Sequence, residues 1–245
     1  MRIVALTPTF RRRRLLQNAI ACFEQQTHGE RYMLIGDDSG EHADQEGDRW
    51  TVWAMPPQQT LPAKYNTMAA EARRRWGVEA VAVFEDDDIY LPRYLERHCQ
   101  ALAQPGAVWS HGSWVWTEGA RGQMQHEETA NARLHGALAM RVEAIDQLGG
   151  WPATARMDFD LHLLALLRQR WPASDPCVFG PAQYVFRWQS TQHYHGQAFS
   201  VGPHDDAWLQ KAQAAIAARL GPVTPQGPLA AVLDADSKKL VDAGW

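Results

Sequence analysis

The chain has 245 residues, of which 45% are hydrophobic and 21% charged, so it can bury the core of one large domain. Its formal net charge of −4 argues against indiscriminate binding to nucleic acid, and no stretch approaches the roughly 20 apolar residues of a membrane span. The N-terminal segment lacks the apolar core of a signal peptide. Three widely spaced cysteines, Cys22, Cys99 and Cys177, lie in apolar surroundings. We expect free thiols in a reducing compartment, and therefore a cytoplasmic protein.

Strand and helix patterns alternate at the start of the chain. Residues 2–6 form a short apolar run, residues 15–26 place apolar side chains at helical spacing, and residues 32–35 form a second apolar run. A strand, a helix and a strand in this order predict a βαβ unit with parallel strands and a right-handed crossover. We therefore expect an α/β fold with a Rossmann-like, mostly parallel central sheet flanked by helices.

Further elements are expected along the rest of the chain. In order they are a strand at 49–53, a helix at 63–76, a strand at 78–84, a helix at 91–103, strands around a turn at 108–117, an apolar segment at 136–140, helices at 142–148 and 158–170, and a strand at 183–188. Beyond them an Ala-rich helix at 207–220 leads into a Pro- and Gly-rich linker at 221–228. We expect one domain over residues 1–202, followed by a helical extension or tail at 203–245.

Polar residues follow three of the predicted strands, in the segments 7–9, 37–40 and 85–88. Ligands of open parallel sheets bind at the carboxyl ends of the strands. Because these ends meet at one edge of the sheet, the three segments are expected to form a single site.

The third of these segments consists of four acids, Glu85, Asp86, Asp87 and Asp88, directly behind an apolar strand pattern. Like charges repel, so an acidic cluster at the end of a buried strand needs a counter-charge. A divalent cation supplies it, because hard cations take carboxylate oxygens and share sites with phosphates. The alternative is a solvated acidic turn, since runs of charge are commonly surface features.

Five segments, in this order along about residues 1–200, together resemble one known family. The chain resembles the glycosyltransferases of the GT-A (nucleotide-diphospho-sugar transferase) fold, and specifically the large inverting family 2. The resemblance implies a donor half at about 1–92 and an acceptor half at about 93–202. The matching segments are Thr7-Pro8-Thr9-Phe10-Arg11-Arg12, Asp37-Asp38-Ser39, Lys64-Tyr65-Asn66, Glu85-Asp86-Asp87, and Gly149-Gly150-Trp151 followed by Asp158-Phe159-Asp160-Leu161.

This resemblance implies a nucleotide-sugar site with a bound cation. Asp87 becomes the main ligand of Mn²⁺ or Mg²⁺, while Asp86 and Glu85 contact the ribose or bound water. The first acidic loop, with Asp37 and Asp38, is implied to hold the uracil and ribose. The donor contacts implied in all are Thr7, Pro8, Thr9, Arg12, Asp37, Asp38, Lys64, Asn66, Glu85 and Asp86; Lys64 stands where the family usually has Arg.

Two late histidines, His193 and His195, follow the last predicted strand, and in an extended segment both rings point the same way. Several GT-A enzymes complete the metal shell with a late histidine, so either ring is a candidate ligand. His195 is the better one, because it adjoins the Gly-containing loop at 196–200. The alternative is an ordinary surface or core histidine.

The same resemblance implies that Asp158 is the general base, with Asp160 as the second candidate. Met157 stands where the family usually has Glu. The alternative is that both acids serve only the N-terminus of a helix, where acidic side chains are favoured by the helix dipole.

The implied function is metal-dependent, inverting transfer of a sugar from a nucleotide-sugar, expected to be a UDP-sugar, to an acceptor hydroxyl. The acceptor is expected to be a saccharide, and the arginine clusters at 11–14 and 73–75 leave room for a hydroxymethylated base in DNA. Two rival functions remain open at this point. One is a metal-dependent nucleotide-sugar hydrolase, and the other is a catalytically silent nucleotide- or sugar-binding module.

Overall fold

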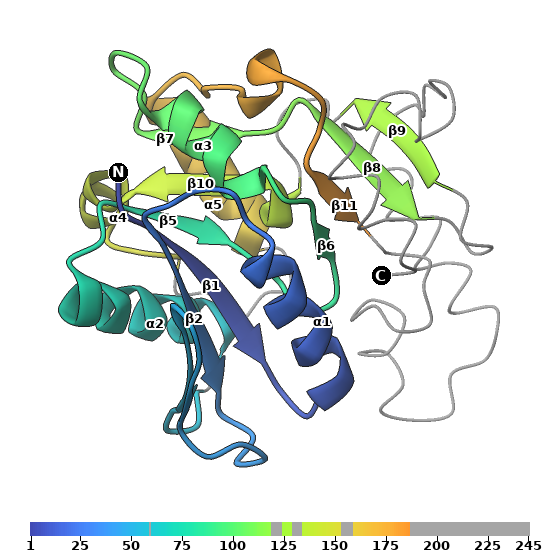
Figure 1. Cartoon of the computed structure of the whole chain (residues 1–245). Helices are drawn as coiled ribbons and strands as arrows, with labels where there is room; N and C mark the ends of the chain where they lie inside the picture. The colour runs from blue at the N-terminus through green and yellow to red at the C-terminus, as the bar shows by residue number, and fades with distance from the viewer. Residues whose placement is uncertain (59, 119–123, 129–133, 153–158, 187–245) are drawn as a thin grey trace, which may run out of the picture.

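The computed structural model describes residues 1–58, 60–118, 124–128, 134–152 and 159–186. In this part of the chain, helices cover both faces of a seven-stranded sheet, and a smaller sheet of four strands stands beside it (Figure 1). The large sheet has the order β3 (Gln45–Glu46), β4 (Trp50–Ala54), β2 (Arg31–Asp37), β1 (Ile3–Thr9), β5 (Ala80–Val83), β10 (Leu138–Arg141), β7 (Trp109–His111). The small sheet has the order β6 (Ile89–Tyr90), β11 (Tyr184–Phe186), β8 (Trp114–Glu118), β9 (Met124–Glu128). The helices are α1 (Arg13–Glu24), α2 (Leu61–Trp76), α3 (Tyr94–Leu102), α4 (Val142–Leu148) and α5 (Phe159–Arg170), with 3₁₀ turns η1 (His135–Ala137) and η2 (Pro176–Phe179).

Two apolar layers form because the side chains of a strand alternate between the faces of its sheet. On β1, Ile3 and Ala5 pack into the layer that contains α1 and α3, whereas Val4 and Leu6 pack into the layer that contains α2, α4 and α5. All four side chains are fully buried. A strand buried on both faces is expected to be continuously apolar, which is what residues 3–6 show.

The expected α/β architecture is confirmed. The pairs β1–β2, β1–β5 and β2–β4 are parallel, and only β3 and β10 run against the other strands of the large sheet. The small sheet was not predicted. Its strand β11 pairs with β6 and β8, which are distant in the sequence, and such non-local pairing leaves no periodicity in the sequence.

The segment 7–9 is not a loop, as the sequence suggested, but the last part of β1, which stays paired with β2 as far as Thr9 and Asp37. Pro8 is tolerated there for a topological reason. The backbone nitrogen of Pro8 points to the same side of β1 as the carbonyl of Leu6. That carbonyl accepts the last hydrogen bond from the β5 side, which the backbone N of Phe84 donates at 3.0 Å. Beyond that bond β1 is an edge on this side, so the missing N–H of proline costs no ladder hydrogen bond.

Local signals set the bounds of α2, which begins two residues before the expected Ala63. The hydroxyl of Thr60 accepts a hydrogen bond from the backbone N of Ala63 at 3.3 Å, and Pro62 lies in the first turn. Gly77 ends the helix in the left-handed conformation, with φ 56°. This capping fixes the first turn of α2, which carries Lys64.

Several other expectations concern burial. All three cysteines are free thiols, as expected, with Cys22 and Cys99 buried. Trp109 and Trp116 are fully buried in the core. No helix within the described ranges is both long and apolar enough to cross a membrane. The expected tail at 203–245 lies outside the described residues.

Candidate functional site

The acidic run lies where β5 ends, at the carboxyl edge of the parallel strands, between the end of β1 and the start of β10. The side chains do not face bulk solvent: Asp86, Asp87 and Asp88 are only 3%, 4% and 2% exposed, and Glu85 is half-buried. Burial of several carboxylates at one place is costly unless positive charge compensates them. The solvated acidic turn is therefore not what this segment forms.

Three of the four acids form a group with the geometry of a cation site. Glu85, Asp87 and Asp88 each offer one carboxylate oxygen, and these oxygens all lie within 4.8 Å of one another. Oxygens on opposite sides of a Mg²⁺ ion are about 4.2 Å apart, because each bond is about 2.1 Å long. A small contraction would therefore let all three bind one ion. Three carboxylate oxygens fit a hard divalent cation such as Mg²⁺ or Mn²⁺.

Asp86 lies outside this group of three and contacts the end of β1. Its carboxylate accepts hydrogen bonds from Thr9 Oγ1 at 2.7 Å and from Arg12 Nη1 at 2.8 Å. The same nitrogen of Arg12 is 3.0 Å from Asp87 Oδ2, so one guanidinium bridges Asp86 and the cation group. Burial and the neighbouring Asp87 raise the pKa of Asp86, against the opposing effect of Arg12.

Asp88 is held from the small sheet. Tyr184, on β11, donates a hydrogen bond from its hydroxyl to Asp88 Oδ2 at 2.5 Å. Burial and the nearby Asp88 raise the pKa of Tyr184 well above its ordinary value, so the phenol remains a donor. On the other side of the run, the backbone N of Glu85 donates to the hydroxyl of Tyr90 at 2.8 Å. Such supporting hydrogen bonds orient potential metal ligands before any ion arrives.

Glu85 is held from β10. His135 lies in η1, immediately before that strand, and its Nδ1 is 3.2 Å from Glu85 Oε1. The indole Nε1 of Trp151 lies 3.0 Å from the other ring nitrogen, Nε2. Burial lowers the pKa of His135 to about 4, so the imidazole is neutral at physiological pH.

Lys64 connects the first turn of α2 to the ends of β1 and β2. Its Nζ donates to the carbonyl of Thr9 at 2.6 Å and to Asp38 Oδ1 at 2.5 Å. Burial lowers the pKa of Lys64, although the ion pair with Asp38 opposes this effect. The ammonium thus adds a second cation, beside Arg12, to the edge of the sheet that carries the acids.

Asp37 mainly holds its own loop in this structure. Its two carboxylate oxygens accept hydrogen bonds from the backbone N and hydroxyl of Ser39, at 2.9 and 2.6 Å, and from the backbone N and ring Nδ1 of His42, at 3.0 and 2.9 Å. Burial acts to raise the pKa of Asp37, but these bonds outweigh it and the pKa is lowered.

Asn66 forms hydrogen bonds with the backbone of Trp151, which lies between α4 and α5. Its amide accepts a hydrogen bond from the backbone N of Trp151 at 2.7 Å and donates one to the carbonyl of the same residue at 3.0 Å. A Cβ on Gly150 would lie 2.3 Å from Asn66 Oδ1, so the preceding glycine is needed for this contact. The Gly-Gly-Trp segment is therefore fastened to α2.

Most residues that the sequence singled out lie around the acidic run. Thr7 and Pro8 are not among them: both lie within β1, where Thr7 is fully buried and Pro8 half-buried. Asp160 is half-buried in the first turn of α5, where Oδ1 accepts a hydrogen bond from the backbone N of Leu161 at 2.8 Å. Asp158, His193 and His195 lie outside the described residues. The residues brought to the edge are Thr9, Arg12, Asp37, Asp38, Lys64, Asn66, Glu85, Asp86 and Asp87.

Sequence reasoning missed Asp88, His135 and Tyr184. Asp88 belongs to the recognised acidic run, but the family motif covers only the first three acids. His135 and Tyr184 carry no sequence signal of a site, because they come close to the acids only through the pairing of β10 with β5 and of β11 with β6.

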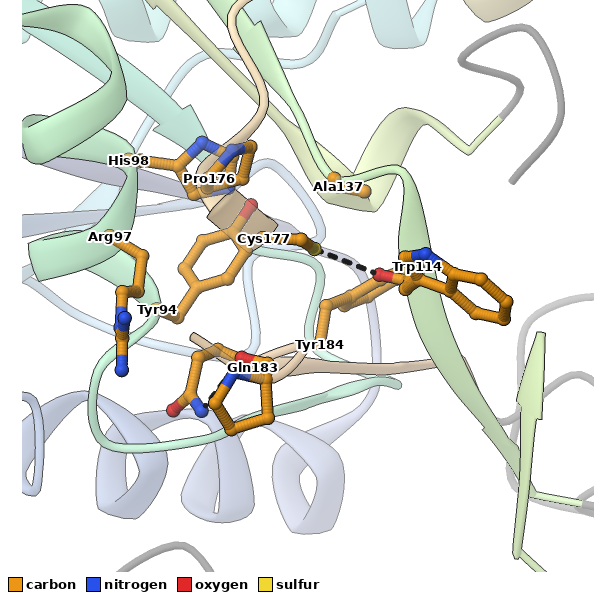
Figure 2. A pocket seen from close by; sticks show the side chains of 11 residues that line it. Tyr94, Arg97, His98, Trp114, Ala137, Pro176, Cys177, Gln183 and Tyr184 are labelled. Carbon is orange, nitrogen blue, oxygen red and sulfur yellow. Dashed lines mark hydrogen bonds between the residues drawn. The ribbon is translucent and has the colours of Figure 1, made fainter. Parts of the chain in front are cut away.

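A small pocket lies between α3 and η2 (Figure 2). Tyr94 and Tyr184 line it together with α3 and η2, and within it the thiol of Cys177 donates to the carbonyl of Trp114 at 3.6 Å. Its volume is about 20 Å³, room for about one water molecule. It cannot hold a nucleotide. A larger hollow of about 630 Å³ lies between α1 and the segment 41–45, and none of the four acids lines it.

Comparison with solved structures identifies the fold. The chain is similar to the mannosyltransferase PcManGT from Pyrobaculum calidifontis in complex with GDP-Man and Mn²⁺, with a TM-score of 0.53 and 16% identity over 99% of this chain and 79% of that one. It is also similar to S. aureus TarS 1–349 in complex with UDP-GlcNAc, with a TM-score of 0.57 and 12% identity over 92% of this chain and 68% of that one. Neither protein-family profiles nor curated protein sequences match the chain. The fold is therefore that of the GT-A glycosyltransferases.

Proposed function

We propose that this protein is a metal-dependent glycosyltransferase that moves a sugar from a nucleotide-sugar, with a UDP-sugar as the first donor to test, to an acceptor hydroxyl with inversion. The observation that carries the proposal is the group formed by Glu85, Asp87 and Asp88 at the carboxyl edge of a GT-A sheet. In open α/β sheets this edge is where ligands bind. The complexes of PcManGT with GDP-Man and Mn²⁺, and of TarS with UDP-GlcNAc, support a nucleotide-sugar donor.

The three carboxylates would hold Mn²⁺ or Mg²⁺, whose chemistry when bound is to neutralise the charge that develops on the departing diphosphate. We propose His195, or His193 in its place, as an additional ligand. Arg12 and Lys64 stand on the β1 side of the acids and are the cations nearest to a diphosphate placed there. Asp37 and Asp38 are proposed to contact the nucleoside.

For the transfer step we propose Asp158 as the general base and Asp160 as its alternative. The base takes the proton from the acceptor hydroxyl while that oxygen attacks the anomeric carbon opposite the diphosphate, which inverts the configuration. Trp151 and Phe159 flank the segment 153–158 in sequence and both contact His135. The chain therefore enters and leaves this segment close to the acidic group.

A saccharide acceptor is favoured over DNA by the environment of the second arginine cluster. Arg74 and Arg75 pair with Glu71, and Arg73 pairs with Asp146. These arginines lie in the last turn of α2, just before Gly77 and β5, and so at the edge of the sheet opposite the acids. Two carboxylates thus offset two of the three positive charges, and the one that remains, at the far edge, gives little attraction for a phosphate backbone near the site.

The test is a thermal-shift screen of nucleotide-sugars with and without Mn²⁺, followed by product analysis with a panel of saccharide acceptors. We expect a donor that stabilises the protein only with Mn²⁺, and transfer that EDTA abolishes. Asp158→Asn should retain donor binding and lose transfer, with Asp160→Asn as the matched comparison. Sugar release at equal rates with and without acceptor would instead identify a hydrolase, and full transfer in chelator-treated protein would refute the proposal.

A further inference from the structure

His135 connects the two ends of the candidate site. It lies in the turn η1 between the acids that follow β5 and the Gly-Gly-Trp segment that follows α4. The backbone of this turn is fixed, because Tyr94 Oη donates to the carbonyl of Gly136 at 2.7 Å. Gly136 also admits Tyr184, whose hydroxyl would lie 2.4 Å from a Cβ at this position. The backbone that carries the imidazole is therefore held in one position.

The partners of the ring determine which nitrogen carries the proton. An indole N–H can only donate, so the Nε2 of His135, 3.0 Å from Trp151 Nε1, must be the unprotonated acceptor. The hydrogen of a neutral ring is then on Nδ1, which donates to Glu85 Oε1 at 3.2 Å. The result is a directed chain of hydrogen bonds from Trp151 through His135 to Glu85.

Aromatic packing makes this chain stiff. The ring of Tyr65 stacks on Trp151 at 5.1 Å with an interplanar angle of 12°, and meets His135 edge to face at 5.0 Å. Phe159 also meets His135 edge to face, at 5.4 Å. A small displacement of the imidazole would therefore displace the rings of Trp151 and Phe159 as well, because close-packed rings cannot move independently.

We propose that His135 is a positioning residue that couples the state of the Glu85 carboxylate to the segment beginning at Trp151. Glu85 belongs to the proposed cation group, and the segment that follows Trp151 carries the proposed base Asp158. Cation binding at Glu85 and the placement of the acceptor side would thus be linked through one imidazole. This inference rests on the proposed function for the role of the cation and of Asp158, but the hydrogen-bond coupling itself exists without either.

Two substitutions separate the two ends of the connection. The terminal atoms of Asn stand as many bonds from Cα as Nδ1, so His135→Asn can still donate to Glu85 but cannot reach Trp151. The terminal atoms of Gln correspond to Nε2, so His135→Gln can still accept from Trp151 but not donate to Glu85. The readout is the indole N–H resonance of Trp151 in ¹⁵N-labelled full-length protein, assigned with Trp151→Phe.

In metal-free protein we expect ¹⁵N shifts of His135 that show protonated Nδ1 and bare Nε2; the opposite tautomer would overturn the inference. We expect Glu85→Ala to shift the Trp151 resonance when His135 is present and not when Asn replaces it. An equal shift in both backgrounds would also overturn it. If the Asn or Gln variants fail to fold, the tautomer of the wild-type protein still decides the outcome.

Titration with diamagnetic Mg²⁺ then tests whether cation binding acts through the same coupling. It should shift the same resonance in the wild type but not in His135→Asn, whereas His135→Gln should bind Mg²⁺ about tenfold more weakly, as expected when a supporting hydrogen bond to a ligand is lost. Binding of Mg²⁺ to the wild type without a shift at Trp151 would refute the coupling. If calorimetry shows no Mg²⁺ or Mn²⁺ binding, the proposed function fails, and the Glu85→Ala result alone decides the coupling.

Discussion

Tyr184 and Asp88, 96 positions apart in the chain, are joined by a hydrogen bond of 2.5 Å that connects the small sheet to the acidic run of the large one. Without this bond the carboxylate of Asp88 would be buried beside two other acids with one supporting donor fewer. A donor that is fixed by packing orients the carboxylate at no further entropic cost.

The first prediction concerns Asp88 itself. Asp88→Asn removes one of the three grouped carboxylates, so we expect affinity for Mn²⁺ to fall at least tenfold. Tyr184→Phe retains the ring and removes only the donor, and a loss of about tenfold is expected. Isothermal calorimetry with Mn²⁺ measures both, with exposed Asp146→Asn as the control. Wild-type affinity in Asp88→Asn would mean that the ion binds elsewhere.

The second prediction concerns Arg12, whose guanidinium bridges Asp86 and Asp87. In Arg12→Gln a positive charge leaves the neighbourhood of the cation group, so Mn²⁺ should bind about fivefold more tightly without nucleotide, an effect of about 1 kcal/mol. UDP-sugar affinity should fall, because the same charge would contact the diphosphate. Titrations of Mn²⁺ and of donor separate the two effects, and the exposed neighbour Arg13→Gln provides the control. Weaker Mn²⁺ binding in Arg12→Gln would contradict this role.

The third prediction concerns the buried pair of Lys64 and Asp38. Lys64→Met leaves Asp38 without its ammonium partner, and we expect a loss of about 2–4 kcal/mol in the free energy of unfolding. Asp38→Asn in the same chain should recover about 1–3 kcal/mol relative to additivity, since the uncompensated charge is then gone. Urea unfolding of the two single variants and the double variant gives the coupling energy. Strict additivity would show that the pair contributes nothing to stability.

The fourth prediction compares two adjacent glycines, both at positive φ, 73° for Gly149 and 94° for Gly150. A Cβ on Gly149 meets open space, so Gly149→Ala should cost only the conformational strain, about 1 kcal/mol. A Cβ on Gly150 would lie 2.3 Å from Asn66 Oδ1, and Gly150→Ala should cost about 2–3 kcal/mol and detach Asn66 from Trp151. Equal destabilisation of the two variants in urea unfolding would show that the contact with Asn66 is unimportant.

The fifth prediction concerns pH. Burial, with a further contribution from His111, lowers the pKa of His98 to about 3. The unfolded chain binds this proton near pH 6.5 and the folded chain does not, so stability is fully present above that pH and falls as the pH decreases toward 3. A loss of about 1–2 kcal/mol by pH 5 is expected.

The control for this pH effect is His98→Asn, which keeps an atom in the place of Nδ1 for the hydrogen bond with Ser110 but cannot titrate. Its stability should depend less steeply on pH between 6.5 and 5 than that of the wild type. Identical slopes in wild type and His98→Asn, from urea unfolding at several pH values, would disprove the assignment.

Much of the architecture follows from local pattern. The apolar run at residues 2–6 and the helical spacing that begins near Leu15 predict the first βαβ unit, and right-handed crossover then places the ends of β1, β2 and β5 at one edge. Thr9, Asp38 and Asp87 meet there, as the order of the strands requires. Chain order alone was sufficient for this, because parallel strands with short connections have few possible arrangements.

Only the tertiary structure determined which partners each of the four acids contacts. Asp86 contacts Thr9 and Arg12, whereas Glu85, Asp87 and Asp88 form the group of three, and Arg12 also reaches Asp87. His135 and Tyr184 joined the site only because β10 and β11 pair with distant strands. Hydrogen bonds depend on distance in space, and the sequence determines that distance only through packing of the whole domain.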